Sequence, residues 1–484
     1  MRSFFSILAG CALTAGALVA GPAGQPPAAD ARFDALASLT EAKMREYGVP
    51  GVAVGVVNGG AVTMRGFGVT SVEFPQPIGE HTVFPIASIS KTFAATVAMR
   101  LVEQGKLDLK APVRKYIPEF RVQDEAASRD ATIWHLLTHT PGWEGQVSGP
   151  DRGSETVSHF LTTITDLMQL APPGAAWSYN NAGFSILGRV FEVVAGQPLN
   201  RVMREQAFTP IGLQHTGTSA GEFITWPFAL GHSVRGGQPA TLNRPFSPSI
   251  TATTGAVGMC ITDMMTYARF HIGDGASASG DRVLTRESVE RTRTPQLKKH
   301  GYDDDMGLGW HLRTVGNVRV AGHGGTLGGH ILLLEIAPER NFAIGILTNS
   351  NTGWRLIQDV ERAALQAYLG ATFAKNQAIS HRGLVETLPS VEPLASQPDP
   401  ALYLGNYRRP MNSVAVRSEG GRVIVQVTPR SGEPQAPMPV SFYGPDRAVV
   451  TEGNDKGQSI EFLRDGSGVV RWVRVTGRIA VKEQ

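Results

Sequence analysis

Cysteine is almost absent from this chain of 484 residues, with Cys11 and Cys260 as the only two. Cys11 lies in an N-terminal apolar stretch that resembles a removable secretory signal. The mature chain is therefore expected to keep one thiol and to form no intrachain disulfide. Its stability must come from a hydrophobic core, which a chain of this length can build.

Dense positive charge and low-complexity sequence are missing as well. The formal net charge is +3, only 18% of the residues are charged, and lysine and arginine form no dense cluster. A nucleic-acid partner is therefore not expected. The hydrophobic content of 42% is ordinary for a folded protein and argues against disorder.

Beyond the N-terminus, no apolar run is long enough to cross a membrane. Met1-Arg2 precedes an apolar stretch over residues 4–20, and Gly- and Pro-rich sequence follows up to Ala31. This order predicts a signal peptide over residues 1–31 and a secreted or periplasmic protein with no stable transmembrane segment after processing. A retained anchor is the alternative. Residues 8–11 resemble a lipoprotein cleavage box, but apolar sequence continues past them, so lipidation is not expected.

The pattern of strands and helices predicts an α/β (α+β) domain over residues 32–387. An amphipathic helix (32–48) precedes two β-rich runs (52–57 and 61–67), which Asn58-Gly59-Gly60 joins as a hairpin. Helices and loops fill residues 106–300, and strand patterns resume over 317–321, 331–336 and 342–347 before a last helix (354–369). We expect one antiparallel sheet, flanked by the terminal helices, with a mainly helical subdomain inserted between its strands.

The C-terminal part has a different pattern. Residues 388–400 contain four prolines and predict a linker. Residues 401–484 show short alternating runs separated by turn residues, which predicts a small β-barrel or sandwich, lipocalin-like in type. The domain contains no candidate nucleophile. The sequence leaves three roles open for this domain, which are covering a functional site, limiting the length of a ligand and mediating dimerisation.

Ser88 and Lys91 form the one S-x-x-K spacing in the chain, at the start of a long apolar helical run. A helix places residues three apart on one face, so the hydroxyl and the ammonium become neighbours. This pair is a candidate nucleophile and base. A polar first turn on a core helix is the competing interpretation.

A serine nucleophile of this kind needs a second basic group, because an unperturbed lysine with a pKa of ~10.4 is almost fully protonated at neutral pH. Tyr179-x-Asn181 is the only Y-x-N among nine tyrosines and precedes an apolar helical run. The tyrosine can therefore point into a cleft from a loop. Alternatively, Tyr179 anchors the loop and Asn181 caps the helix.

These motifs together resemble the serine β-lactamase and penicillin-binding-protein superfamily, in particular the branch with class C β-lactamases, D-alanyl-D-alanine carboxypeptidases, D-aminopeptidases and esterases. The resemblance extends over residues 34–370. It implies that Ser88 forms an acyl-enzyme with Lys91 and Tyr179 as acid–base groups, without a cofactor or metal, on a small ester, peptide or β-lactam substrate. Further similar segments lie at residues 105–109, 111–113, 136–140 and 306–310, and residues 403–407 resemble the start of a small β-domain found in related peptidases.

The family also has an H-x-G or K-T-G triplet on a sheet strand beside the cleft. Candidates for this triplet begin at His215, His323 and His381, and among these only His323 lies between strand patterns. By resemblance, Asn181 and His323 bind substrate, Gly325 keeps the strand accessible to it, and the backbone N–H groups of Ser88 and Thr326 form the oxyanion hole.

Two departures bear on the substrate. The triplet is His-Gly-Gly where β-lactamases have Lys-Thr-Gly, and the E-x-x-L-N motif of class A enzymes is missing. We therefore expect an esterase or D-amino-acid-specific peptidase. A true β-lactamase or D,D-carboxypeptidase and a non-catalytic cell-wall-binding or regulatory protein are the alternatives. The oligomeric state is not predicted.

Two further sequence features resemble sites of other types. His135 and His139 lie four apart on a predicted helix, but Leu136 stands where a zinc peptidase needs glutamate, so a structural pair is expected. The glycine pairs 324–325 and 328–329 lack the G-K-[ST] ending of a phosphate-binding loop.

Overall fold

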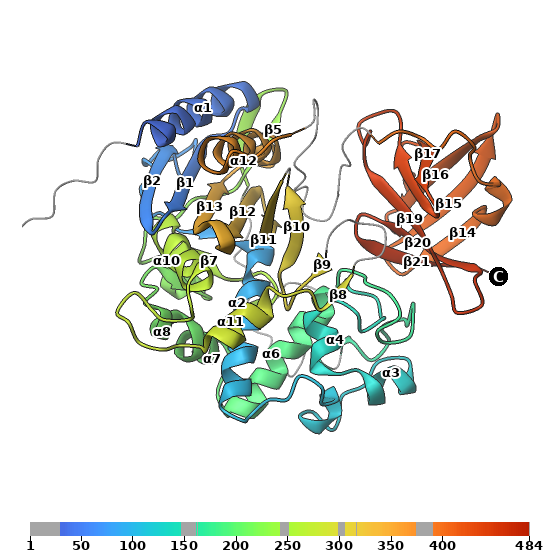
Figure 1. Cartoon of the computed structure of the whole chain (residues 1–484), viewed down its shortest axis with the longest axis horizontal. Helices are drawn as coiled ribbons and strands as arrows, with labels where there is room; N and C mark the ends of the chain where they lie inside the picture. The colour runs from blue at the N-terminus through green and yellow to red at the C-terminus, as the bar shows by residue number, and fades with distance from the viewer. Residues whose placement is uncertain are drawn as a thin grey trace, which may run out of the picture.

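The computed structural model describes residues 30–146, 161, 163–242, 251–298, 305–315, 317–373 and 391–483. The predicted signal peptide therefore lies almost entirely outside the described residues. Figure 1 shows a larger α/β domain beside a separate β-barrel formed by the C-terminal strands. Among the described residues, no helix is long and apolar enough to cross a bilayer.

The main sheet is antiparallel and has eight strands in the order β2-β1-β13-β12-β11-β10-β9-β8. Its N-terminal hairpin turns through Gly59 and Gly60, both with positive φ, as the sequence predicts. The predicted sheet is confirmed but larger, because β8, β9 and β10 extend its edge. The strands are β1 (Gly51–Asn58), β2 (Ala61–Gly68), β8 (Leu297–Lys298), β9 (Asp305–Met306), β10 (His311–Val315), β11 (Val318–Leu327), β12 (His330–Ala337) and β13 (Phe342–Thr348).

Each face of the sheet is covered by a different set of helices. The terminal helices α1 (Ala31–Tyr47) and α12 (Gly353–Leu369) pack on one face, where Val52, Val54 and Val56 belong to their core cluster. Helix α10 (Ile261–Ile272) covers the other face. A Cβ at Gly345 would lie 2.6 Å from the Met265 thioether methyl, so glycine there lets α10 approach the strands closely.

The inserted subdomain is mainly helical, as predicted. It holds α2 behind the predicted nucleophile turn and two small sheets of short strands. Its elements are β3 (Phe84–Pro85), η1 (Ala87–Ile89), α2 (Ser90–Glu103), η2 (Val113–Lys115), α3 (Glu125–Asp130), α4 (Ile133–Leu137), α6 (Asn181–Ala195), α7 (Leu199–Met203), the π-helical turn η3 (Arg204–Phe208), α8 (Thr209–Ile211), β4 (Thr216–Gly217), α9 (Ala220–Phe223), β5 (His232–Arg235), β6 (Gln238–Thr241), β7 (Gly258–Met259) and α11 (Arg286–Thr292); η5 (Pro338–Arg340) turns between β12 and β13.

The C-terminal domain is a closed barrel of strands β14 to β21 in sequence order. Aromatic side chains, including Tyr403, Tyr407, Phe442 and Phe462, fill part of its interior. Residues 391–399 carry no helix or strand, and Leu394 N donates to Phe442 O of the barrel. The elements are η6 (Pro400–Leu402), β14 (Gly405–Arg409), β15 (Asn412–Glu419), β16 (Arg422–Pro429), β17 (Met438–Gly444), β18 (Arg447–Val450), β19 (Ser459–Arg464), β20 (Val470–Val475) and β21 (Arg478–Lys482).

Candidate active site

Ser88 lies in a tight 3₁₀ turn that leads directly into α2. A 3₁₀ helix has about three residues per turn, so side chains three apart eclipse one another. Lys91 Nζ accordingly lies 3.2 Å from Ser88 Oγ. Ala87, the residue before Ser88, has a left-handed φ of 48°, a strained conformation for a residue with a side chain. The strained residue therefore lies directly before the serine.

Lys91 is completely buried, which is rare for a lysine. Its ammonium nitrogen donates to Thr254 O at 2.8 Å and lies 4.9 Å from the centre of the Tyr179 ring. Burial, with a smaller contribution from the Arg478 cation, lowers the pKa of Lys91 well below its ordinary value. A neutral amine beside a serine hydroxyl can accept that hydroxyl's proton.

Tyr179 is buried in the loop before α6, and its ring lies beside Lys91. Burial raises the pKa of Tyr179, and a hydrogen bond with Ser88 partly opposes that rise. His139 stacks on the phenol ring with centroids 4.5 Å apart, and its Nδ1 accepts from Asn180 N at 2.9 Å. The structure thus brings Ser88, Lys91 and Tyr179 together, with the phenol favoured in its protonated form.

The two asparagines after Tyr179 have different surroundings. Asn180, and not Asn181, caps α6, because its Oδ1 accepts from Gly183 N at 2.7 Å. Asn181 Nδ2 donates to Gln146 Oε1, whereas Asn181 Oδ1 has no partner among the described residues. Asn181 Oδ1 could therefore accept a hydrogen bond from a substrate. The substrate-binding role of Asn181 stays a prediction.

Strand β11 forms the opposite side of the site. The His323 ring centre lies 6.2 Å from that of Tyr179, and His323 Nδ1 lies 2.6 Å from Gly324 O. The predicted oxyanion-hole residue Thr326 follows on the same strand and is exposed. Of the other H-x-G triplets, the one at His215 lies in a different cluster beside β4, the one at His271 lies at the end of α10, and the one at His381 falls outside the described residues.

The structure gives a different reason for a glycine at position 325 from the one that the sequence suggested. A Cβ at this position would lie 2.5 Å from Ile86 O and 3.1 Å from the Ala87 Cβ. The missing side chain thus faces the Ser88 turn and lets the strand approach it closely, whereas the sequence suggested that it keeps the strand open to substrate.

The C-terminal barrel contributes a wall that the sequence did not predict. Tyr179 N donates to Gly477 O at 2.9 Å, and Ile479 N donates to Ser178 Oγ at 3.3 Å. Arg478 Nε donates to Tyr179 O, and the guanidinium carbon lies 5.5 Å from the centre of the Tyr179 ring. These residues carry no motif and lie about 300 positions from Tyr179, so no local signal could have identified them.

Trp472 adds a second contact between barrel and main domain. Its indole nitrogen donates to Leu170 O at 2.6 Å, and the ring shares a buried cluster with Ala171 and Ala176. The barrel is thus docked by packing as well as by polar contacts.

Neither of two other features forms part of this site. The histidine pair of residues 135 and 139 does not converge, because His135 Nδ1 accepts from Thr132 N while His139 lies under Tyr179. Among the described residues, His81, His215 and Cys260 place one potential metal ligand each within 4.8 Å of one another. Burial raises the pKa of the Cys260 thiol to about 12, which favours the protonated form over the thiolate that metals bind.

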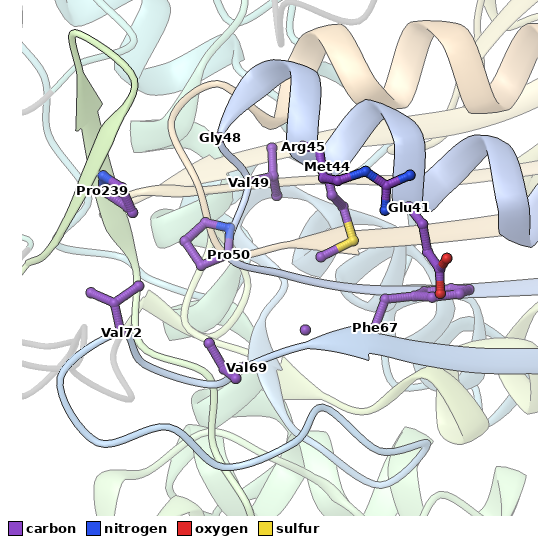
Figure 2. A pocket seen from close by; sticks show the side chains of 11 residues that line it. Glu41, Met44, Arg45, Gly48, Val49, Pro50, Phe67, Val69, Val72 and Pro239 are labelled. Atoms are coloured by element: carbon purple, nitrogen blue, oxygen red, sulfur yellow. The ribbon is translucent and has the colours of Figure 1, made fainter.

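A cavity of about 520 Å³ lies beside the C-terminal end of α1. Figure 2 shows Met44 reaching from the helix toward the strand that carries Phe67, with Val49 and Pro50 beside it. The lining contains no serine, histidine or tyrosine, so this cavity offers none of the chemistry of the Ser88 site.

Comparison with known proteins places the chain in a family. The family described as Beta-lactamase matches residues 36–368. Penicillin-binding protein 4 of Amycolatopsis lactamdurans is 30% identical over 353 residues, which is 70% of this chain and 89% of that protein. Esterase EstB of Burkholderia gladioli is 34% identical over 207 residues, covering 40% of this chain and 52% of the esterase.

A solved structure matches nearly the whole chain, barrel included. The crystal structure of SurE with D-Leu has a TM-score of 0.75 and 25% identity, and the match covers 94% of this chain and 100% of that one. The resemblance inferred from Ser88, Lys91 and Tyr179 is therefore confirmed at the level of the family. The chain belongs to the β-lactamase family, within the superfamily of serine β-lactamases and penicillin-binding proteins.

Proposed function

We propose that this protein is a serine hydrolase that cleaves carboxylic esters or peptide bonds through an acyl-enzyme on Ser88. The observation that carries the proposal is the contact between the Ser88 hydroxyl and the buried Lys91 amine, 3.2 Å apart. Relatives named as a penicillin-binding protein and an esterase support a hydrolase in general.

In the first half-reaction, Ser88 Oγ attacks the substrate carbonyl carbon and its proton passes to the neutral Lys91 amine. The carbonyl electron pair moves onto oxygen and then returns as the bond to the leaving group breaks. Tyr179 gives its proton to the leaving group and recovers one from Lys91, so both residues return to their resting forms. The pKa values support Lys91 as the base and Tyr179 as the acid, because burial lowers the pKa of Lys91 and raises the pKa of Tyr179.

The second half-reaction repeats these steps with water. Water attacks the acyl carbon, loses a proton through the same pair, and Ser88 Oγ leaves with a proton restored. In each half-reaction the negative charge on the carbonyl oxygen would be held by the backbone N–H groups of Ser88 and Thr326. Losing one such donor typically costs ~10²–10³ in rate.

For the substrate, we favour esters and peptides with D-amino acids over β-lactams. His323-Gly324-Gly325 provides neither the lysine cation nor the hydroxyl that Lys-Thr-Gly offers to a β-lactam carboxylate. The SurE structure was determined with D-Leu bound, which is consistent with a D-amino acid as part of the substrate. Export after removal of residues 1–31, and the division into residues 32–387, a linker at 388–400 and residues 401–484, are part of the same proposal.

The test is a panel of nitrocefin, short-chain p-nitrophenyl esters and D-alanyl peptides on one purified sample. We expect turnover of the esters or the D-peptides to exceed that of nitrocefin, and Ser88→Ala to abolish it. Ser90→Ala is the matched control, because Ser90 is buried and its Oγ accepts from Val257 N, away from Lys91. Unchanged turnover in Ser88→Ala would refute the proposal, and preferred turnover of nitrocefin would identify a β-lactamase instead.

A further inference from the structure

The open end of the barrel contains a cavity of about 470 Å³ that no step of the proposed reaction uses. This volume lies within the range of small-molecule sites in proteins, about 300–1,000 Å³. Apolar side chains of the barrel interior, among them Val414, Val427 and Met438, form part of its wall. Polar side chains form the rest, and two of them carry buried donors without partners.

Arg409 is the most unusual of these side chains. It is the last residue of β14, two positions after Tyr407, and so faces the barrel interior. It is only 8% exposed, and its Nε donates to Asn412 Oδ1 at 2.6 Å. Arg409 Nη1, however, is buried without a hydrogen-bond partner in the described part of the chain. A buried guanidinium with an unused donor is costly unless an acceptor fills the place.

Gln458 presents a second donor of the same kind. It lines the cavity, is 3% exposed, and its Nε2 has no partner among the residues that the structure describes. The charged lining consists of Arg409, Arg478 and one acidic residue, Asp455. Burial lowers the pKa of Arg409 to about 10, and the buried carboxylate of Glu144, in the main domain, partly opposes that fall. The two unused groups are therefore donors, in a lining with more positive than negative charge.

The cavity is joined to the catalytic cleft through one residue. Arg478 lines the cavity, and the same side chain donates to Tyr179 O and lies over the Tyr179 ring. Thr476, in the turn that contacts Tyr179 through Gly477, lines it too. Arg478 therefore links the cavity to Tyr179, the residue that protonates the leaving group in the proposed reaction.

We propose that the mouth of the barrel is a substrate subsite that binds the free carboxylate of an apolar residue at the end of the leaving group, with Arg409 and Gln458 as donors. A carboxylate can accept from both, and the valine and methionine walls suit an apolar side chain. The inference rests on the proposed hydrolase function and specifies its substrate as a peptide or depsipeptide with a free carboxyl end.

The test measures inhibition of p-nitrophenyl acetate hydrolysis by N-acetylated D-leucine dipeptides and tripeptides, each as the free acid and as the C-terminal amide. We expect the acid of at least one length to bind about tenfold or more tightly than its amide, since hydrogen bonds between charged groups are the strong ones. In Arg409→Gln the ratio of amide to acid inhibition constants should fall toward one. The matched control is Arg408→Gln, the exposed neighbour on the same strand, which should keep the wild-type ratio.

Two readouts separate the subsite from the hydrolase proposal. If the wild type hydrolyses neither p-nitrophenyl acetate nor the D-alanyl peptides, the hydrolase proposal itself fails. If it does, and acid and amide inhibit equally at every length, or Arg409→Gln keeps the wild-type ratio, the subsite proposal is overturned. If Arg409→Gln does not fold by circular dichroism, Gln458→Leu takes its place with the same expected fall in the ratio.

Discussion

The backbone N–H of Tyr179 donates to the carbonyl oxygen of Gly477, 2.9 Å away, and so ties the predicted catalytic tyrosine to the C-terminal barrel. Arg478, the next residue, covers the face of the same ring. The barrel thus forms part of the wall of the candidate active site. The sequence left several roles open for the C-terminal domain. Covering the cleft and controlling substrate length both agree with this contact, and both stay proposals.

The first prediction concerns Arg478 and the pH dependence of activity. The Arg478 cation lowers the pKa values of both Lys91 and Tyr179. Without this cation both pKa values rise. Lys91 then becomes neutral only at higher pH, and Tyr179 stays protonated up to higher pH. In Arg478→Ala, both limbs of the kcat/KM profile should move to higher pH.

Two variants control this measurement. Arg478→Lys keeps the charge and should keep more of the wild-type profile, while Arg417→Ala removes an exposed arginine on the barrel surface. A profile for Arg478→Ala that coincides with that of wild type would show that Arg478 does not act on the catalytic pair.

The second prediction concerns the activity of Lys91→Met, which replaces the amine by an apolar group of similar length. Removing a general base typically costs about 10²–10⁴ in rate, so kcat should fall by that amount. Lys106→Met is the control, because Lys106 is exposed just beyond α2. A variant with kcat within a factor of about three of wild type would exclude Lys91 as the base.

The third prediction is that the same substitution stabilises the fold, in a pH-dependent way. Burial lowers the pKa of Lys91 from its ordinary 10.5, so below that pH the unfolded chain binds the proton more readily than the native state. The native wild type is therefore penalised increasingly as pH falls from 10.5 toward the native pKa. Urea unfolding should show Lys91→Met more stable than wild type near neutral pH, with a smaller difference near pH 10.5. A difference that does not change with pH would contradict the lowered pKa.

The sequence predicted the parts of the site that local motifs specify. Ser88 and Lys91 meet because helical spacing alone brings them together, and His323 was chosen because strand patterns surround it. The short strand β9, next to the edge strand β8, was missed because two residues carry no alternating pattern. Gly477 and Arg478 were missed because their role arises only from the docking of the barrel, a long-range contact that no local pattern encodes.

The fourth prediction concerns Gly325, where a Cβ would lie 2.5 Å from Ile86 O. Gly325→Ala must push β11 away from the Ser88 turn, which should lower the free energy of unfolding by about 1–3 kcal/mol. It should also lower kcat/KM, since misplacing catalytic groups by about 1 Å can cost 10²-fold. Gly221→Ala is the control, because a Cβ there meets nothing within 4 Å. Full activity in Gly325→Ala would show that this close approach does not position the turn.

The central claim is that Ser88 carries the acyl group during turnover. Intact-mass spectrometry of the enzyme quenched with acid during hydrolysis of a slowly deacylated p-nitrophenyl ester tests it directly, with peptide mapping to locate the added mass. The account predicts one acyl group per chain, on the peptide that contains Ser88, and none in Ser88→Ala. An acyl group on another residue, or turnover without any adduct and without labelling by a fluorophosphonate, would contradict it.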